Sequence, residues 1–169
     1  MNNAPSRFDE LDMRITGWMA RYGIVMLRIS LGLIFFWFGV LKFFPGLSPA
    51  SDLATRTMDM LTFGMMPGAV SVPALATLEC LIGLGLLFNV FLRATLFLLF
   101  FQMLGTVTPV FLFPHEVFTQ IPYAPTMEGQ YIIKNLVLIG AGLVIGATVR
   151  GPDKIAHPEV IEEVEEKLS

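Results

Sequence analysis

The sequence predicts an all-α membrane protein, a bundle of four transmembrane helices with both termini in the cytoplasm. Its composition, four long apolar runs and the distribution of its basic residues lead to this prediction. Of the 169 residues, 54% are hydrophobic and only 15% are charged, and the mean hydropathy is +0.69. Soluble domains carry ~25% charged residues. We therefore expect apolar side chains to face lipid as well as a core, in a chain whose length suits one domain.

Each of the four apolar runs is long enough to cross ~30 Å of hydrocarbon as a helix. They span residues 23–44, 71–90, 91–113 and 130–149. The first stops at Pro45 and the third at Pro114. The connection between the second and third runs is so short that these two helices must be antiparallel neighbours. Residues 23–149 thus form the predicted transmembrane domain.

Basic residues indicate the orientation of the bundle. They precede the first span, mark the short loop between the second and third spans, and follow the fourth: Arg7, Arg14, Arg21, Arg93, Arg150 and Lys154. The loop 114–128 has no Lys or Arg, and the loop 45–68 has only Arg56. By the positive-inside rule, both termini are cytoplasmic and the two long loops lie outside.

Segments on either side of the spans are predicted to lie outside the hydrocarbon. Within residues 1–22, apolar side chains recur every three or four positions: Phe8, Leu11, Ile15, Trp18 and Tyr22. This pattern favours an amphipathic helix in the membrane interface, or alternatively one packed on a partner protein. Because acidic residues at 9, 10 and 12 do not fit a basic leader, we expect the first span to be retained. Residues 150–169 form an acidic cytoplasmic tail, and residues 49–61 a short helix that covers the bundle mouth as an apolar lid.

Each span contains a polar side chain that lipid tolerates poorly: Arg28, Glu79, Gln102 and Lys134. A charge at the bilayer centre costs ~2.5–3.5 kcal/mol on insertion scales, so such residues usually face a bundle interior and find a partner there. We predict that they converge on a polar centre with Glu79 as its only acid. Lys42, Lys134 and Arg28 are the candidate partners of Glu79, and the sequence does not choose between them.

This centre supplies the candidate site residues. Glu79 and Lys134 are the candidate catalytic groups, and the candidate ligand-binding residues are Arg28, Lys42, Gln102 and Asn135. Glycines at helical spacing predict close helix packing at Gly32, Gly39, Gly83, Gly142 and Gly146. One alternative is that the charges form an interhelical ion-pair network that only fixes the bundle. The other is a polar pocket for a small or amphipathic ligand. A quinone headgroup would fit, with Lys134 or Gln102 donating to a carbonyl and Glu79 relaying a proton.

Several other chemistries are excluded or unsupported. The single cysteine, Cys80, can form neither an internal disulfide nor a thiol pair. Both histidines, His115 and His157, lie outside the apolar runs, so this chain alone cannot hold a bis-histidine haem within the membrane. No metal motif is evident, and no basic patch indicates nucleic-acid binding.

At these residues the chain resembles the DoxX-like membrane protein family, including its YkgB-type branch. An Arg, two glycines and a final Lys in the first span match the family pattern, as do the Glu and Gly of the second span: Arg28, Gly32, Gly39, Lys42, Glu79 and Gly83. The segments 129–136 and 151–153 also resemble the YkgB-type sequence and the Gly-Pro exit after the last helix. The resemblance covers roughly residues 21–153.

The resemblance implies a multi-pass protein of the bacterial inner membrane. Family members include a subunit linked to thiosulfate:quinone oxidoreduction, and many have no assigned activity. This implies a small subunit of a membrane-associated redox or quinone-linked complex, with a quinone as the cofactor to consider and a membrane or soluble oxidoreductase as partner. Because the chain has no thiol pair, a partner or bound quinone must supply the path of the electrons. The alternatives are a non-catalytic assembly or scaffold subunit, alone or as an oligomer, and a small-solute carrier, which the absence of an inverted repeat disfavours.

Overall fold

The computed structural model describes residues 7–44, 46–48 and 51–150, and these are almost entirely helical. The helices are α1 (Arg7–Leu41), α2 (Ser51–Leu61), α3 (Gly68–Phe88), α4 (Leu92–Val107), α5 (Pro109–Leu112), α6 (Pro114–Val117) and α7 (Met127–Ala147). The strands β1 (Phe118–Gln120) and β2 (Ala124–Pro125) form a small hairpin, and a 3-10 turn (Thr148–Arg150) follows α7. The predicted tail beyond Arg150 lies outside the described residues.

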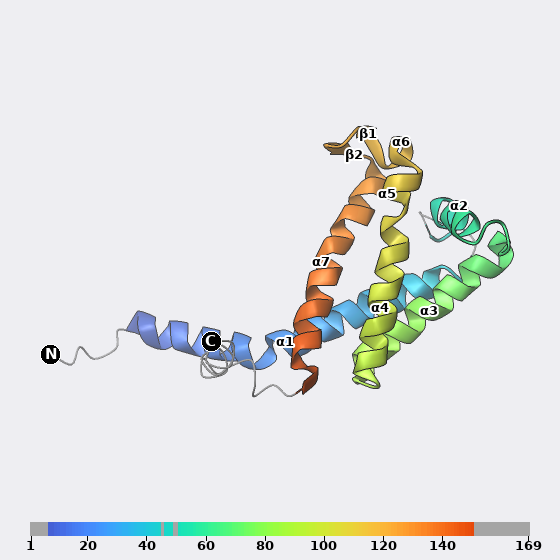
Figure 1. The fold of residues 1–169 in the computed structure, drawn as a ribbon. Helices are drawn as coiled ribbons and strands as arrows, with labels where there is room; N and C mark the ends of the chain where they lie inside the picture. The colour runs from blue at the N-terminus through green and yellow to red at the C-terminus, as the bar shows by residue number, and fades with distance from the viewer. Residues whose placement is uncertain (1–6, 45, 49–50, 151–169) are drawn as a thin grey trace, which may run out of the picture.

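Four segments are long and apolar enough to cross a membrane: Leu11–Leu41, Gly68–Phe88, Leu92–Leu112 and Met127–Ala147. The predicted all-α architecture of four spans is therefore confirmed. The helix α1 packs mainly on α3, α4 packs on α7, and α3 packs on α4. In Figure 1, α2, α5, α6 and the hairpin gather at one end of the bundle, and the tight turn between α3 and α4 lies at the other.

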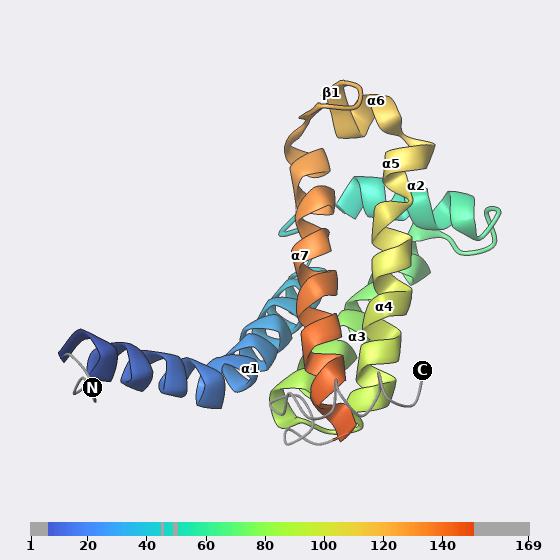
Figure 2. The ribbon, with the colours of Figure 1, turned by 60° about the vertical axis from the view of Figure 1, so that its left-hand side comes forward.

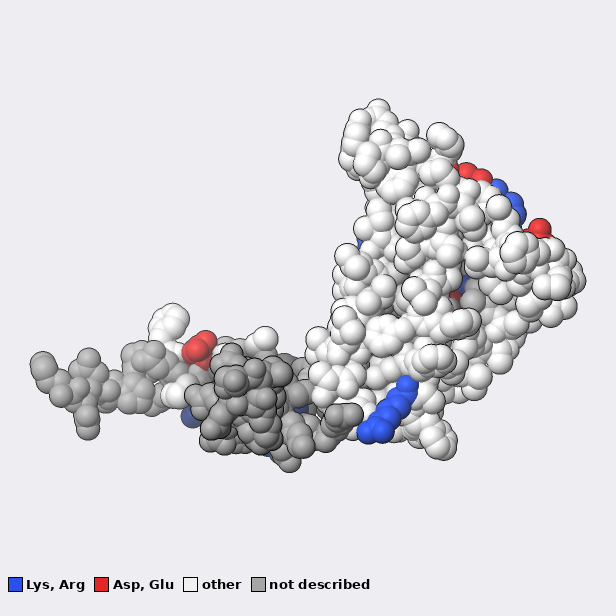
Figure 3. Space-filling model, in the orientation of Figure 1, with Lys and Arg blue, Asp and Glu red and all other residues white. Residues whose placement is uncertain are grey.

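The lateral surface of the bundle is apolar. Large side chains on all sides are mostly exposed, among them Trp37, Phe97 and Leu136, which are 62%, 70% and 71% accessible. Figure 3 shows few charged side chains on the side of the bundle, and those at its upper end gather at one edge. A contiguous apolar surface of this extent is unusual for a soluble monomer, and lipid is the solvent that suits it.

The first helix is longer than the sequence predicted. The amphipathic segment 1–22 and the span 23–44 join in one continuous helix, α1, within the described residues. No proline interrupts this stretch, and its single glycines at 17 and 23 do not break it. Figure 2 shows the N-terminal half of α1 running away from the bundle. Trp18 is exposed there and packs its ring 5.7 Å from that of Tyr22.

The third span consists of two helices rather than one. Helix α4 ends at Val107, and α5 resumes at Pro109 after Thr108. Proline has no backbone N–H, so the helical hydrogen bond from position 109 cannot form. The sequence prediction missed this break. It also missed the hairpin between α6 and α7. The strands of this hairpin are too short to show the alternation of apolar and polar residues that predicts a strand.

Glycines allow α1 and α3 to touch along their backbones. A Cβ atom added to Gly83 would lie 2.5 Å from the backbone nitrogen of Phe36. At Gly39, an added Cβ would lie 2.9 Å from the backbone nitrogen of Cys80 and from the Cβ of Glu79. Gly32 similarly lies against the backbone of Gly83. This close seam places the end of α1 directly beside the middle of α3.

The seam makes a testable prediction. Replacing Gly83 with Ala should lower the free energy of unfolding by about 1–3 kcal/mol, because the new methyl group overlaps the α1 backbone. Gly140→Ala on α7 is the matched control, since nothing lies within 4 Å of a Cβ added there. Both variants gain the same helix propensity. Unfolding of both variants in detergent micelles would measure the difference, and equal stability would contradict the close seam.

Candidate functional site

Polar side chains from three elements meet in the bundle. They are Lys42, in the turn after α1, Glu79 in the middle of α3, and Gln102 in the middle of α4. The ammonium nitrogen of Lys42 donates to Oε2 of Glu79 at 2.6 Å, and the amide nitrogen of Gln102 donates to Oε1 of Glu79 at 2.6 Å. Both carboxylate oxygens therefore accept hydrogen bonds, which is the pattern of an ionised carboxylate. We call these residues the Lys42–Glu79–Gln102 cluster.

The cluster lies deep in the predicted membrane. Gln102 is ten residues from each end of the span Leu92–Leu112, so it lies about 15 Å from either end. Glu79 and Gln102 are buried, with 7% and 4% of their surfaces exposed. The long stem of Lys42 carries its charge from the end of α1 to the carboxylate. The seam at Gly39 makes this reach possible, because it brings α1 against Glu79.

One atom of the cluster has no partner. The side-chain oxygen of Gln102, Oε1, is buried and makes no hydrogen bond with the described residues. Its amide nitrogen is committed to Glu79, so the oxygen must point elsewhere. An unpaired buried polar atom costs ~1–3 kcal/mol, and native proteins rarely leave one without a reason. A hydrogen-bond donor that reached this oxygen, from water or from another molecule, would remove that cost.

Arg28, a predicted member of the polar centre, lies elsewhere. Its guanidinium donates to the backbone oxygen of Leu86 at 2.5 Å and to that of Leu87 at 3.4 Å. These carbonyls belong to the last turn of α3, where helical partners run out. A positive charge there also offsets the helix dipole. In this structure Arg28 ties α1 to the end of α3 and does not contact Glu79.

Lys134 and Asn135 also lie apart from the cluster. Lys134 is exposed, with its nitrogen 5.7 Å from the centre of the Tyr131 ring, and Asn135 is half-buried. Neither makes an ion pair or hydrogen bond with Glu79. No residue of α7 from Gln130 to Gly140 is buried, whereas Ala141, Gly142 and Ile145 are. The stretch of α7 between the buried Gly129 and Ala141 is thus only partly covered by its neighbours, which helical periodicity could not reveal.

The glycines of α7 differ from those of the α1–α3 seam. A Cβ added to Gly142 would lie 3.2 Å from the Phe100 ring on α4. A Cβ added to Gly146 would meet a single neighbour, Leu96, at the ordinary contact distance of 3.6 Å. Gly142 therefore serves a close packing contact, whereas Gly146 has room beside it.

A second set of charges links the elements at one end of the bundle. Arg56 of α2 donates to both carboxylate oxygens of Glu116 in α6, at 2.7 and 2.5 Å, and to Asp52 at 3.0 Å. Its guanidinium also lies 5.1 Å from the centre of the Phe113 ring. The short helix predicted in this loop is present as α2, whose own Leu53 and Thr57 are buried. Arg56 ties this helix to α6. Sequence reasoning missed this link, since the partners are sixty positions apart on separate loops.

The link shifts the titration of both groups. Its hydrogen bonds with Arg56, followed by the attraction of that charge, hold the pKa of Glu116 below its ordinary value. The same hydrogen bonds raise the pKa of Arg56 further above its already high value. Both groups lie outside the membrane-spanning segments.

Comparison with known proteins adds one finding. The sequence model of the DoxX family matches residues 23–115, which include all three members of the Lys42–Glu79–Gln102 cluster and end before α7. The match names no branch within that family. No curated protein and no solved structure matches the chain.

The ion pair predicts energetic coupling between Lys42 and Glu79. Lys42→Met leaves the carboxylate without its cation, and Glu79→Gln leaves the ammonium without its anion. We expect the double variant to lose about 1–2 kcal/mol less than the sum of the single losses, near the upper limit for polar contacts between membrane helices. Unfolding of the four proteins in one detergent measures this coupling. Additive losses would mean that the pair does not interact.

The link between α2 and α6 should open in acid. Because the pKa of Glu116 is lowered by folding, the pairing with Arg56 is fully present above the ordinary carboxyl pKa of ~4.3. It is lost as the pH falls through the lower pKa of folded Glu116. Spin labels at Asp59 and Gln120, in a Cys80→Ser background, would report a longer distance only in acid. Glu116→Gln should show the longer distance at every pH, and an unchanged acid transition in that variant would assign the opening to another group.

Proposed function

Since the chain belongs to the DoxX family of membrane proteins, we propose that it is a small subunit of a membrane-associated redox complex and binds a quinone headgroup at the Lys42–Glu79–Gln102 cluster. The observation that carries this proposal is the buried, unpaired oxygen of Gln102 beside a buried ion pair. The membrane setting favours a ligand that reaches the site through lipid. A quinone has an apolar tail for the bilayer and a polar headgroup for the cluster.

The cluster offers both kinds of hydrogen-bonding group that a quinone needs. The Lys42 ammonium has three donors, and its one hydrogen bond within the described residues goes to Glu79. A further donor is therefore available for a quinone carbonyl. The Gln102 oxygen would accept from the hydroxyl group of the reduced form. The sequence had assigned the donor role to Lys134 or Gln102, and the distances favour Lys42 instead.

Reduction of a quinone to its hydroquinone takes up two electrons and two protons. Lys42 is placed to pass its proton directly to a headgroup oxygen. The ionised Glu79 carries no proton at rest, so each further proton has to be taken up from the aqueous phase by Glu79 before Glu79 returns it to Lys42. We expect the electrons to come from a partner oxidoreductase, because a single cysteine cannot form a thiol–disulfide couple within this chain. The chain's own contribution is then to bind and orient the quinone and to move protons.

The exposed lysine of α7 supports a role as a subunit. Lys134 lies seven residues inside α7, about 10 Å from its start, yet its side chain is exposed on a predicted span. Charged residues at such depth are almost always paired or turned into a bundle. We propose that a membrane partner covers this part of α7 and supplies an acidic or polar group. The same observation favours the second candidate function, a non-catalytic assembly subunit.

The test is gentle purification in native lipid, followed by mass spectrometry of the bound quinone and proteins. We expect quinone to be retained by the native protein and by Glu116→Gln, a control that removes a carboxylate outside the spans. In Glu79→Gln we expect quinone retention to fall about tenfold, because Lys42 and Gln102 lose the carboxylate that orients them towards the headgroup, and a misplaced hydrogen bond from a charged group costs ~1.5–3 kcal/mol.

Other outcomes would redirect the proposal. Quinone at the level of the surrounding lipid, or equal retention in Glu79→Gln, would contradict a quinone site at the cluster. A stable protein partner without bound quinone would assign the chain to the assembly role.

A further inference from the structure

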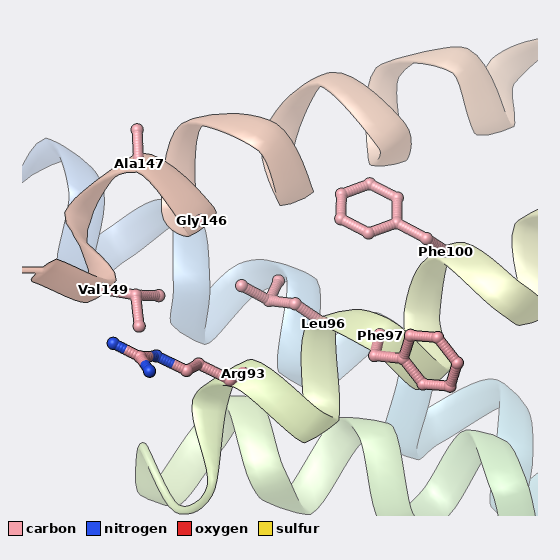
Figure 4. Close-up of a pocket in the computed structure, with 7 residues that line it drawn as sticks. All are labelled: Arg93, Leu96, Phe97, Phe100, Gly146, Ala147 and Val149. Atoms are coloured by element: carbon pink, nitrogen blue, oxygen red, sulfur yellow. The ribbon is translucent and has the colours of Figure 1, made fainter.

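An open groove lies between the start of α4 and the end of α7, away from the Lys42–Glu79–Gln102 cluster. It holds about 580 Å³ and is lined by Arg93, Leu96, Phe97, Phe100, Gly146 and Val149, together with their neighbour Ala147. Figure 4 shows the Arg93 side chain at one end, facing Val149, and the two phenyl rings farther along α4. Neither the family match nor the proposed quinone chemistry assigns this groove a role.

We propose that the groove binds an anionic glycerophospholipid, with its phosphate at Arg93 and an acyl chain along Phe97 and Phe100. The groove is charged at one end and apolar along the rest of its length, as such a lipid is. Arg93 is in the first turn of α4, at the end of a membrane span, where headgroups lie. Phe100 is seven residues farther, about 10 Å deeper in the hydrocarbon. A basic group at the headgroup level between transmembrane helices, as Arg93 is here, is typical of anionic-lipid sites.

The charge at the mouth of the groove is open to a ligand. Arg93 is exposed, and no carboxylate of the described residues lies within salt-bridge distance of it. The adjoining helix end adds partial positive charge, because the N-cap residue of α4, Phe91, supplies no side-chain cap and the first turn has no acidic residue. A headgroup of net negative charge therefore complements this end better than a zwitterionic headgroup, whose own cation offsets its phosphate.

The shape of the groove suits an acyl chain. Its volume falls within the ~300–1,000 Å³ usual for ligand sites. The floor on α7 is Gly146, where an added Cβ would meet only Leu96, at 3.6 Å. The ring of Phe97 is 70% exposed and forms a wall that no described residue covers. Because the groove opens sideways, a lipid could enter from the bilayer without leaving it.

Native mass spectrometry of the full-length protein in detergent tests the proposal, with phosphatidylglycerol and phosphatidylcholine of identical acyl chains as probes. We expect the native protein to bind phosphatidylglycerol at least about fivefold more tightly, the effect of one basic contact with an anionic lipid. Arg93→Gln should remove this preference. Arg21→Gln, which loses an exposed arginine outside the groove, should retain it.

A second variant tests the acyl-chain part. Gly146→Leu fills the groove and leaves Arg93 in place, so binding of both lipids should fall. Equal affinity for the two lipids in the native protein would overturn the anionic site, as would equal losses in Arg93→Gln and Arg21→Gln. Unchanged lipid binding in Gly146→Leu would overturn the groove as the place of the chain.

Discussion

The arrangement of the bundle depends on the ion pair between Lys42 and Glu79. A carboxylate near the middle of α3 is stabilised only if a cation and a hydrogen-bond donor reach it in a medium where water cannot. Lys42 and Gln102 meet that need at 2.6 Å each, from the turn after α1 and from α4. The pair therefore fixes the end of α1 against α3, and the amide fixes the rotation of α4. The same hydrogen bond explains why the Gln102 oxygen has no partner within the described part of the chain: the side chain has turned its nitrogen towards Glu79, so its oxygen points away from Glu79.

Glycines and charged side chains in this protein both hold α1 against α3. The α1–α3 seam at Gly39 and Gly83 brings backbones into contact, and only this approach lets the lysine at the end of α1 reach the acid. Arg28 anchors the other end of the same helix pair on the last carbonyls of α3. Together these contacts hold α1 and α3 as one unit. In contrast, α7 has no buried residue between Gly129 and Ala141, which leaves Lys134 for a partner in the proposed subunit role.

Much of the fold could be predicted from the sequence, because membrane spans follow from apolar length and close packing follows from glycine spacing. Glu79, Lys42 and Gln102 were all candidates, since an ionisable or amide group on an apolar helix stands out. The choice of Lys42 over Lys134 could not be predicted, because it depends on which face of α7 the other helices cover, and the structure leaves Lys134 exposed. The Arg56–Glu116 link and the groove at Arg93 could not be predicted either. Both form between segments distant in the sequence, with no periodic pattern to relate them.

Infrared difference spectroscopy of the native protein against Glu79→Gln in lipid membranes at neutral pH tests this account most directly. Two donors on the two oxygens of Glu79 require an ionised carboxylate beside Lys42. The account predicts that the substitution removes carboxylate absorption and no carboxylic acid absorption, and that Lys42→Met alters the same bands. Loss of a protonated carboxylic acid band instead would show that Glu79 is neutral, and would contradict the ion pair on which the bundle and its proposed site depend.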